Sequence, residues 1–411
     1  MRKSIWIIFL APVLLSLVLL ACAEEDMDMD DNQVNIELDD WNKFQFDNFN
    51  SGASSATPPK NKPKIVWQNN EIDDILSSPI LVDGKLYFGD IDRYFYRLDA
   101  ASGSIEWSVQ LNGRILGSFP TLIDDVIYIG NESGTLYAIS AESGESIWSL
   151  DLNNDILGCP IVLENRLYLT DNDGILYCID VQSGELIWFK DECLSNSTLA
   201  VNDNILYSLT QCSYSDPEID FKLYAFDAIS GDILWSDGYS GVGARDATIS
   251  VKDDKLIFGT AGFIYCINAD TREVEWRYED DSRIKFNSSA AIKDDKLFIG
   301  SWTTASPVFD PFLLCLDLET GEEIWRNTFD RFNSIMTPPT IGANNVLTIV
   351  LGGDAGLVAL DAESGVELWR INEGNNGSLL RGASRGEPIL SKDYIFWGTG
   401  LGSTGGIVAL K

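Results

Sequence analysis

A tryptophan that recurs eight times at a nearly constant spacing limits the folds open to this chain more than any other feature. Neighbouring members of the series lie 40 to 49 residues apart. Repeats of this length that hold several short strands each are typical of β-propeller blades. The members are Trp67, Trp107, Trp148, Trp188, Trp235, Trp276, Trp325 and Trp369.

Each repeat has the same internal pattern, for which residues 118–150 are an example. Strand-like runs cover 118–123, 126–130, 135–139 and 146–150, and turn residues such as Asp124 and Gly144 separate them. The runs are short and rich in β-branched and aromatic residues, which is typical of antiparallel strands. We therefore expect four strands per repeat, named A to D from the propeller axis outward.

The two ends of the repeat region complement each other. Residues 388–410 contain only three strand-like runs, while Ile65-Val66-Trp67 forms a single run near the start. Pairing these runs would complete a last blade and remove the exposed sheet edges. The sequence therefore predicts an all-β fold, an eight-bladed β-propeller of four-stranded antiparallel blades over residues 63–411.

The link between strands C and D has a fixed form. An aspartate, a glycine four residues later and the tryptophan recur, as in the segments 99–107, 180–188 and 361–369. The aspartate can bond nearby backbone amides, while the glycine adopts positive φ. These residues resemble the tryptophan-docking repeats of the pyrroloquinoline-quinone-like (PQQ-like) β-propeller superfamily over about residues 64–411. Arg272 replaces the turn glycine and Arg97 replaces a small residue of strand C, so we expect their two blades to be irregular.

The N-terminal residues are predicted to be a targeting segment. Residues 1–21 have a basic start and an apolar run, and Leu19-Leu20-Ala21-Cys22 resembles the bacterial lipobox. We expect cleavage before Cys22 and lipidation of its thiol, which would hold the mature protein on a membrane. Residues 22–62 are acidic and then rich in Asn, Ser, Gly and Pro, a composition that predicts a flexible tether. The predicted location is the outer membrane of a Gram-negative bacterium, on its periplasmic or cell-surface face.

Composition argues against several classes of function. The formal net charge is −34, so nucleic acid, which requires clusters of Lys and Arg, is not an expected partner. The chain contains no histidine, which removes the commonest general base and metal ligand. We therefore predict no catalytic set, no metal and no cofactor. The surplus carboxylates are interpreted as surface residues that keep the protein soluble.

The cysteines and one acidic turn have structural interpretations. Cys178, Cys266 and Cys315 occupy the small-residue position of strand C, where they are expected to be buried as small apolar groups. Cys193 and Cys212 flank neighbouring strands of one blade, and they could form a disulfide in an oxidising compartment. The segment 171–174 resembles the start of a calcium loop but lacks the later ligands, so we interpret it as a turn between strands B and C.

Arginines in the D-to-A connections form a candidate binding rim. The longest insertions, 211–220, 302–311, 372–387 and 401–405, fall in B-to-C or D-to-A connections, which emerge on one face of a propeller. Arginine binds carboxylates bidentately, so an anion or acidic-peptide site is one interpretation, and neutralisation of neighbouring acidic residues is the other. The candidate residues are Arg114, Arg245, Arg283, Arg331, Arg381 and Arg385.

The function is predicted from a resemblance. A lipobox, eight docking-type blades and no catalytic set resemble the BamB-like branch of outer-membrane assembly lipoproteins. This resemblance implies a monomeric, non-catalytic scaffold that binds protein partners at the membrane. Two alternatives stay open. One is a quinoprotein-type oxidoreductase, although the adjacent cysteines of that group are missing. The other is a surface glycan-binding lipoprotein, for which Trp302, Phe309 and Phe312 are candidate exposed aromatic residues.

Overall fold

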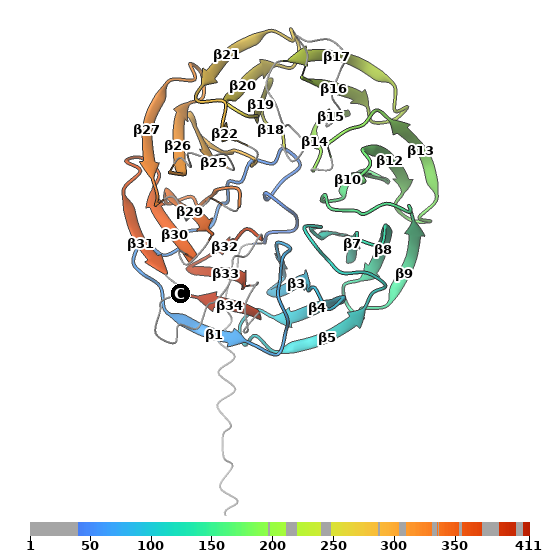
Figure 1. The fold of residues 1–411 in the computed structure, drawn as a ribbon. Helices are drawn as coiled ribbons and strands as arrows, with labels where there is room; N and C mark the ends of the chain where they lie inside the picture. Colours follow the sequence, from blue (N-terminus) through green and yellow to red (C-terminus); the bar gives the residue numbers. More distant parts are fainter. Residues whose placement is uncertain are drawn as a thin grey trace, which may run out of the picture. The chain divides into compact units, whose positions relative to one another are not determined.

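The computed structural model describes residues 40–195, 198–210, 220–239, 248–286, 288–303, 310–330, 335, 337–352, 356–371, 386–399 and 406–411. Eight four-stranded antiparallel sheets form a ring within residues 36–411 (Figure 1). The predicted eight-bladed, all-β propeller is therefore confirmed. No helix in the described part of the chain is long and apolar enough to cross a membrane.

The blades follow one another in chain order around the ring. Blades 1 to 4 comprise β2 (Ile80–Val82), β3 (Lys85–Gly89), β4 (Tyr94–Asp99), β5 (Ile105–Gln110); β6 (Thr121–Ile123), β7 (Val126–Ile129), β8 (Thr135–Ser140), β9 (Ser146–Asp151); β10 (Ile161–Leu163), β11 (Arg166–Thr170), β12 (Ile175–Asp180), β13 (Leu186–Asp191); and β14 (Ala200–Asn202), β15 (Ile205–Leu209), β16 (Phe221–Asp227), β17 (Ile233–Tyr239). Blades 5 to 8 comprise β18 (Ser250–Lys252), β19 (Lys255–Gly259), β20 (Phe263–Asn268), β21 (Val274–Glu279); β23 (Ala291–Lys293), β24 (Lys296–Gly300), β26 (Phe312–Asp317), β27 (Glu323–Thr328); β28 (Thr340–Ile341), β29 (Val346–Leu351), β30 (Gly356–Asp361), β31 (Glu367–Ile371); and β32 (Ile389–Ser391), β33 (Tyr394–Thr399), β34 (Gly406–Leu410), β1 (Ile65–Asn69). Two short strands, β22 (Ile284–Lys285) and β25 (Trp302–Thr303), form a separate pair.

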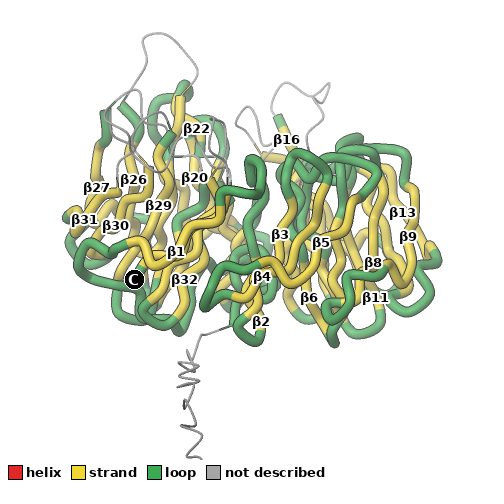
Figure 2. Tube along the Cα trace, turned by 90° about the horizontal axis from the view of Figure 1, so that it is seen from below, coloured by secondary structure: helices red, strands yellow, loops and turns green. Residues whose placement is uncertain are grey.

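Blade 8 closes the ring with both ends of the repeat region. Strand β1 pairs antiparallel with β34, and Trp67 lies opposite Ala409. This arrangement confirms the predicted closure. It also leaves no free sheet edge where the ring begins and ends. Seen edge-on in Figure 2, the strands run between two faces that carry the turns.

The tryptophans of the repeat lock each blade to the next one. The indole Nε1 of Trp107 donates a hydrogen bond of 3.1 Å to the carbonyl of Ala141, and Trp148 bonds Val181 at 3.0 Å in the same way. The turn glycine of the next blade lies against the indole. Gly365 has φ +68°, and a Cβ atom there would lie 2.6 Å from the ring of Trp325. The glycine is therefore required both for the turn and for the stacked indole.

Small residues of strand C lie directly opposite the tryptophans of strand D. Ala138 pairs with Trp148, and Cys178 pairs with Trp188. Cys178, Cys266 and Cys315 are free and fully buried, as predicted. The expectation of two irregular blades is wrong. Arg97 pairs with Trp107 in the usual register, and its guanidinium donates to the carbonyls of the next blade's turn.

Buried apolar side chains gather between neighbouring blades. Between blades 5 and 6, for example, Ile264 and Trp276 pack in one cluster with Ile299 and Phe312. The expectation that Phe312 is exposed is therefore wrong. Each blade therefore contributes to two such layers, and the ring is stabilised by repeated sheet-on-sheet contacts that bury apolar area.

The predicted flexible tether is wrong for residues 40–59. Residues 40–59, here called the axial segment, run inside the ring and then outward to β1 (Figure 1). Trp41 is fully buried and pairs with Leu81 of β2 through two backbone hydrogen bonds of 2.6 and 2.9 Å. The axial segment has a polar composition, but many of its backbone amide and carbonyl groups form hydrogen bonds with the ring strands instead of with water. The signal peptide, Cys22 and the first part of the predicted tether, residues 22–39, lie outside the described residues.

Candidate binding site

The axial segment closes the centre of the ring by bonding to the innermost strands of six blades. In each of these strands the same central position donates its backbone N–H to a carbonyl of the segment, at 2.8 to 3.0 Å in all six blades. The donors are Leu81, Leu122, Val201, Val251, Ile292 and Ile341. Because each bond goes to a different blade, the segment acts as a shared edge partner for strands that would otherwise have free inner edges.

Buried polar side chains hold the segment in place. The fully buried Asn50 donates from Nδ2 to the carbonyls of Leu199 at 3.0 Å and Ile249 at 2.9 Å. Glu387, which is also fully buried, accepts hydrogen bonds from the backbone N–H of Gln45 at 2.7 Å and from the Gln45 side-chain amide. The contacts between Gln45 and Glu387 join two segments that are more than 300 residues apart in the chain.

Two ionisable side chains, Lys43 of the axial segment and Glu387, are buried near each other. Burial raises the pKa of Glu387 to about 7, while the hydrogen bonds from Gln45 oppose this shift. Burial also lowers the pKa of Lys43, whose Nζ donates to Asn48 at 3.2 Å. Desolvation disfavours the charged form of each group. Lys43, Gln45 and Glu387 are therefore enclosed in the interior of the ring, away from solvent.

The outer end of the axial segment replaces a missing turn. Blade 8 takes its last strand from the N-terminal side, so it has no C-to-D turn to receive the tryptophan of blade 7. The indole Nε1 of Trp369 instead donates 2.9 Å to the carbonyl of Pro59. The segment thus completes the inter-blade bonding pattern at the closure point, a role that the sequence analysis missed.

The described arginines of the predicted rim have acidic partners. Arg283 forms an ion pair with Asp281, in which Arg283 is exposed and Asp281 is half-buried. The Nε of Arg114 donates to Glu132 at 2.6 Å. These two arginines fit the interpretation of charge neutralisation. Arg245, Arg331, Arg381 and Arg385 lie outside the described residues, so the rim as a whole stays a prediction.

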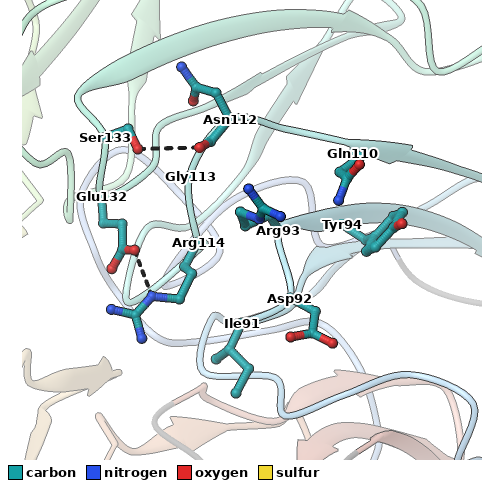
Figure 3. Close-up of a pocket in the computed structure, with 10 residues that line it drawn as sticks. All are labelled: Ile91, Asp92, Arg93, Tyr94, Gln110, Asn112, Gly113, Arg114, Glu132 and Ser133. Carbon is teal, nitrogen blue, oxygen red and sulfur yellow. Dashed lines mark hydrogen bonds and ion pairs between the residues drawn. The ribbon is translucent and has the colours of Figure 1, made fainter.

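Arg114 also lines a polar pocket between blades 1 and 2 (Figure 3). The pocket has a volume of about 600 Å³. Its walls are the B-to-C turn of blade 1 at 91–94, the D-to-A connection at 110–114, and residues 132–133 of blade 2. Arg93 is the second arginine of this pocket. Arg93 was not among the predicted rim residues, which lie in D-to-A connections, because it lies in a B-to-C turn.

Only one cysteine of the predicted disulfide lies within the described residues. Cys193 is disulfide-bonded, whereas Cys212 lies outside the described residues, so the predicted Cys193–Cys212 pairing stays a prediction.

The segment 171–174, which resembles the start of a calcium loop, forms a turn. Asp171 accepts hydrogen bonds from the backbone N–H groups of Asp173 and Ile175, both at 3.0 Å. Its other oxygen accepts from the Tyr177 hydroxyl at 2.8 Å. These bonds form the B-to-C turn that the sequence predicted. The described residues contain no cluster of three or more His, Cys, Asp or Glu side chains that could hold a metal.

Pyrroloquinoline quinone, after which the superfamily is named, does not fit the described axial residues. A planar, multiply anionic quinone needs a flat slot and cationic partners. Phe44 instead stacks on Phe119 with ring centroids 4.4 Å apart, and Lys43 is bonded to Asn48. The carboxyl group of Glu387 lies in the same region and would repel an anion when ionised.

Comparison with solved structures gives the same fold at low sequence identity. BamB from Moraxella catarrhalis is 15% identical, with a TM-score of 0.66, over 85% of this chain and 99% of that chain. Quinohemoprotein alcohol dehydrogenase from Comamonas testosteroni is 14% identical, with a TM-score of 0.71, over 90% of this chain and 80% of that chain. At these identities the likeness concerns the fold alone.

Sequence matches to a dehydrogenase and to the BamB family model differ in how much of this chain they cover. A polyvinylalcohol dehydrogenase of Pseudomonas sp. is 26% identical over 114 residues. This match covers 26% of the chain and only 17% of that enzyme's length. A family model described as outer membrane protein assembly factor BamB matches residues 97–301 and 260–411. Since these matches cover more than half of the chain, the protein belongs to the family described as outer membrane protein assembly factor BamB.

Proposed function

We propose that this protein is a lipid-anchored, non-catalytic scaffold that binds protein partners during the assembly of outer-membrane proteins. The observation that carries the proposal is the axial segment, which bonds to the inner strands of six blades and buries Trp41, Gln45 and Asn50 inside the ring. Binding is thereby directed to the blade edges, the connecting loops and the pockets between blades, which are the surfaces that a scaffold uses. Membership of the BamB family supports the same conclusion.

The proposed location follows from the N-terminal sequence and the family. Lipidation of Cys22 would hold the propeller at the outer membrane of a Gram-negative bacterium. An alkyne fatty acid supplied to the cells should label the wild-type protein and leave Cys22→Ser unlabelled. Equal labelling of both would remove the lipid anchor from the proposal.

A quinoprotein oxidoreductase is the second candidate. The likeness to quinohemoprotein alcohol dehydrogenases and the 114-residue match to polyvinylalcohol dehydrogenase favour it. The absence of histidine and of adjacent cysteines from the sequence and the occupied axis speak against it. Fold alone does not decide between the two functions.

The test is affinity capture of the tagged, full-length protein from outer membranes in mild detergent, followed by mass spectrometry. We expect an outer-membrane β-barrel and its assembly partners, in smaller amounts when Arg381 and Arg385 are both changed to Glu. The matched control is Arg283→Glu, which changes the charge of one surface arginine that has its own acidic partner. Capture without such partners, together with alcohol oxidation after addition of the quinone and calcium, would establish the oxidoreductase instead.

A further inference from the structure

Arg93 occupies a backbone position at which three other blades have a glycine. In blades 2, 3 and 5 the residue at this position of the B-to-C turn is a glycine, and its carbonyl accepts a hydrogen bond from the D-to-A connection at 2.8 or 2.9 Å. In blade 1 the carbonyl of Arg93 accepts the same bond from Leu111 at 2.8 Å. The glycines are Gly134, Gly174 and Gly262, with φ of +78°, +84° and +83°.

A side chain at this position is sterically unfavourable. A Cβ atom on Gly134 would lie 2.7 Å from the backbone nitrogen of Asn154, and one on Gly174 would lie 2.5 Å from that of Leu194. Arg93 has φ +73°, a left-handed conformation that costs energy for any residue with a Cβ. Backbone strain of this kind is often found at functional sites, which makes the surroundings of the Arg93 side chain a candidate site.

The Arg93 side chain lines the pocket between blades 1 and 2 (Figure 3). The side chain is exposed, and Arg93 forms no ion pair within the described part of the chain. Arg114 lines the same pocket and uses its Nε for Glu132, so its two terminal nitrogens remain free of this contact. Asn112 and Ser133 add polar groups to the wall. The guanidinium group of Arg93 is therefore available to donate several hydrogen bonds to a ligand in the pocket.

The charges of the pocket favour a carboxylate over a more highly charged anion. Guanidinium groups match the planar, two-oxygen geometry of a carboxylate. Glu132 compensates one of the two arginines, so a doubly charged phosphate would gain less here than a singly charged group. Asp92 also lines the pocket, so two carboxylates stand beside the two arginines, and the site can take up one further carboxylate more readily than a group of higher negative charge.

We propose that this pocket binds an acidic side chain of a partner polypeptide through the guanidinium group of Arg93, with Arg114 on the opposite wall of the pocket. The inference rests on the proposed scaffold function and identifies one of its contact sites. Because charge-assisted hydrogen bonds carry such contacts, the binding weakens with increasing salt.

The test measures peptide binding to the purified full-length protein in detergent by fluorescence anisotropy. The probe is a fluorescein-labelled nonapeptide that contains three Glu among Gly and Ser. Its matched control peptide contains Gln in place of Glu. We expect Arg93→Gly to weaken Glu-peptide binding roughly tenfold, the effect of losing one strong charge-assisted contact. This variant restores the residue of the other blades, so its thermal stability should be maintained or raised.

Two further variants separate the pocket from general electrostatics. Arg283→Gln removes a positive charge that already has a partner, and it should leave the affinity within twofold of wild type. Glu132→Gln releases Arg114 and should strengthen binding. Equal weakening by Arg93→Gly and Arg283→Gln, equal binding of the Glu and Gln peptides, or no binding by wild type would overturn the proposal. Competition by millimolar phosphate that exceeds competition by acetate would assign the pocket to phosphate and also overturn it. None of these results depends on recovery of partners from membranes, so this test can fail while the scaffold function stands.

Discussion

Replacement of Trp41 by alanine tests whether the axial segment is part of the folded core. Trp41 is fully buried in a cluster that includes Leu81 and Trp397. An aromatic side chain of this size buries roughly 150–250 Å². At about 25 cal/mol per Å² this burial stabilises the fold by about 4–6 kcal/mol, and large-to-small changes of this kind typically cost about 3–5 kcal/mol. We expect Trp41→Ala to reduce the free energy of unfolding by about 4 kcal/mol.

Differential scanning calorimetry would measure this effect. For a cooperative unit of this size, a loss of about 4 kcal/mol corresponds to a fall in Tm of about 5 °C. The matched control is Phe49→Ala in the same segment. Phe49 is 43% exposed, so its truncation should cost about 1 kcal/mol. A change of less than 1 °C for both variants would refute the reasoning, because it is the result expected of a flexible tether.

Three other predictions concern single positions in the ring. Gly365→Ala should lower the free energy of unfolding by about 2 kcal/mol or more, since the turn has positive φ and the added methyl group meets an indole. Arg272 has φ +64°, so Arg272→Gly should raise the free energy of unfolding by about 1 kcal/mol. Urea titration would measure both changes. Burial raises the pKa of Glu387 in the folded state to about 7 from its ordinary value of 4.5, so the folded state binds more protons between these values and stability should fall as pH rises through that window. Glu387→Gln should flatten this part of the stability profile, and an unchanged slope would contradict the assignment. Cys193→Ser and Cys212→Ser should each lower stability by about 3 kcal/mol, with no further effect of a reductant on Tm; a reductant effect that persists in Cys212→Ser would show that Cys193 has another partner.

The blades could be predicted because each one repeats the same local chemistry. The tryptophan, the turn aspartate and the turn glycine lie within ten residues of one another in most repeats, and their pairing partners are in the same or the next blade. Ring closure followed from simple strand counting, because the last blade lacked one strand and a single run near the start supplied it. Local periodicity is the signal that sequence reasoning reads best.

The axial segment could not be predicted in the same way. Its successive residues bond to different blades, so Asn48 contacts blade 4 and Gly52 contacts blade 7, and no strand or helix period results. Its Asn, Ser, Gly and Pro content is also typical of linkers. One signal was present, because Trp41, Phe44 and Phe46 follow one another closely, and a solvated tether has little use for several large aromatic residues.

The pocket arginine was missed for a different reason. Arg93 is a departure from the repeat, and the sequence alone does not give the backbone conformation that makes this departure costly. The repeat position could be assigned only once the structure had given φ +73° and the hydrogen bond from Leu111. Departures from a repeat are therefore most informative when they occur at positions where the backbone restricts the residue type.

Hydrogen exchange of the axial segment tests most directly whether the ring is closed at its centre by its own chain. Mass spectrometry would follow peptides covering residues 41–54 in the full-length protein under native conditions. The amides of Trp41 and Ser54 donate to the carbonyls of Leu81 and Ile341, so we expect them to exchange as slowly as the amides of the blade strands. Exchange at the rate of an unstructured peptide would contradict the closed axis, and with it the structural basis for placing partner binding on the outside of the ring.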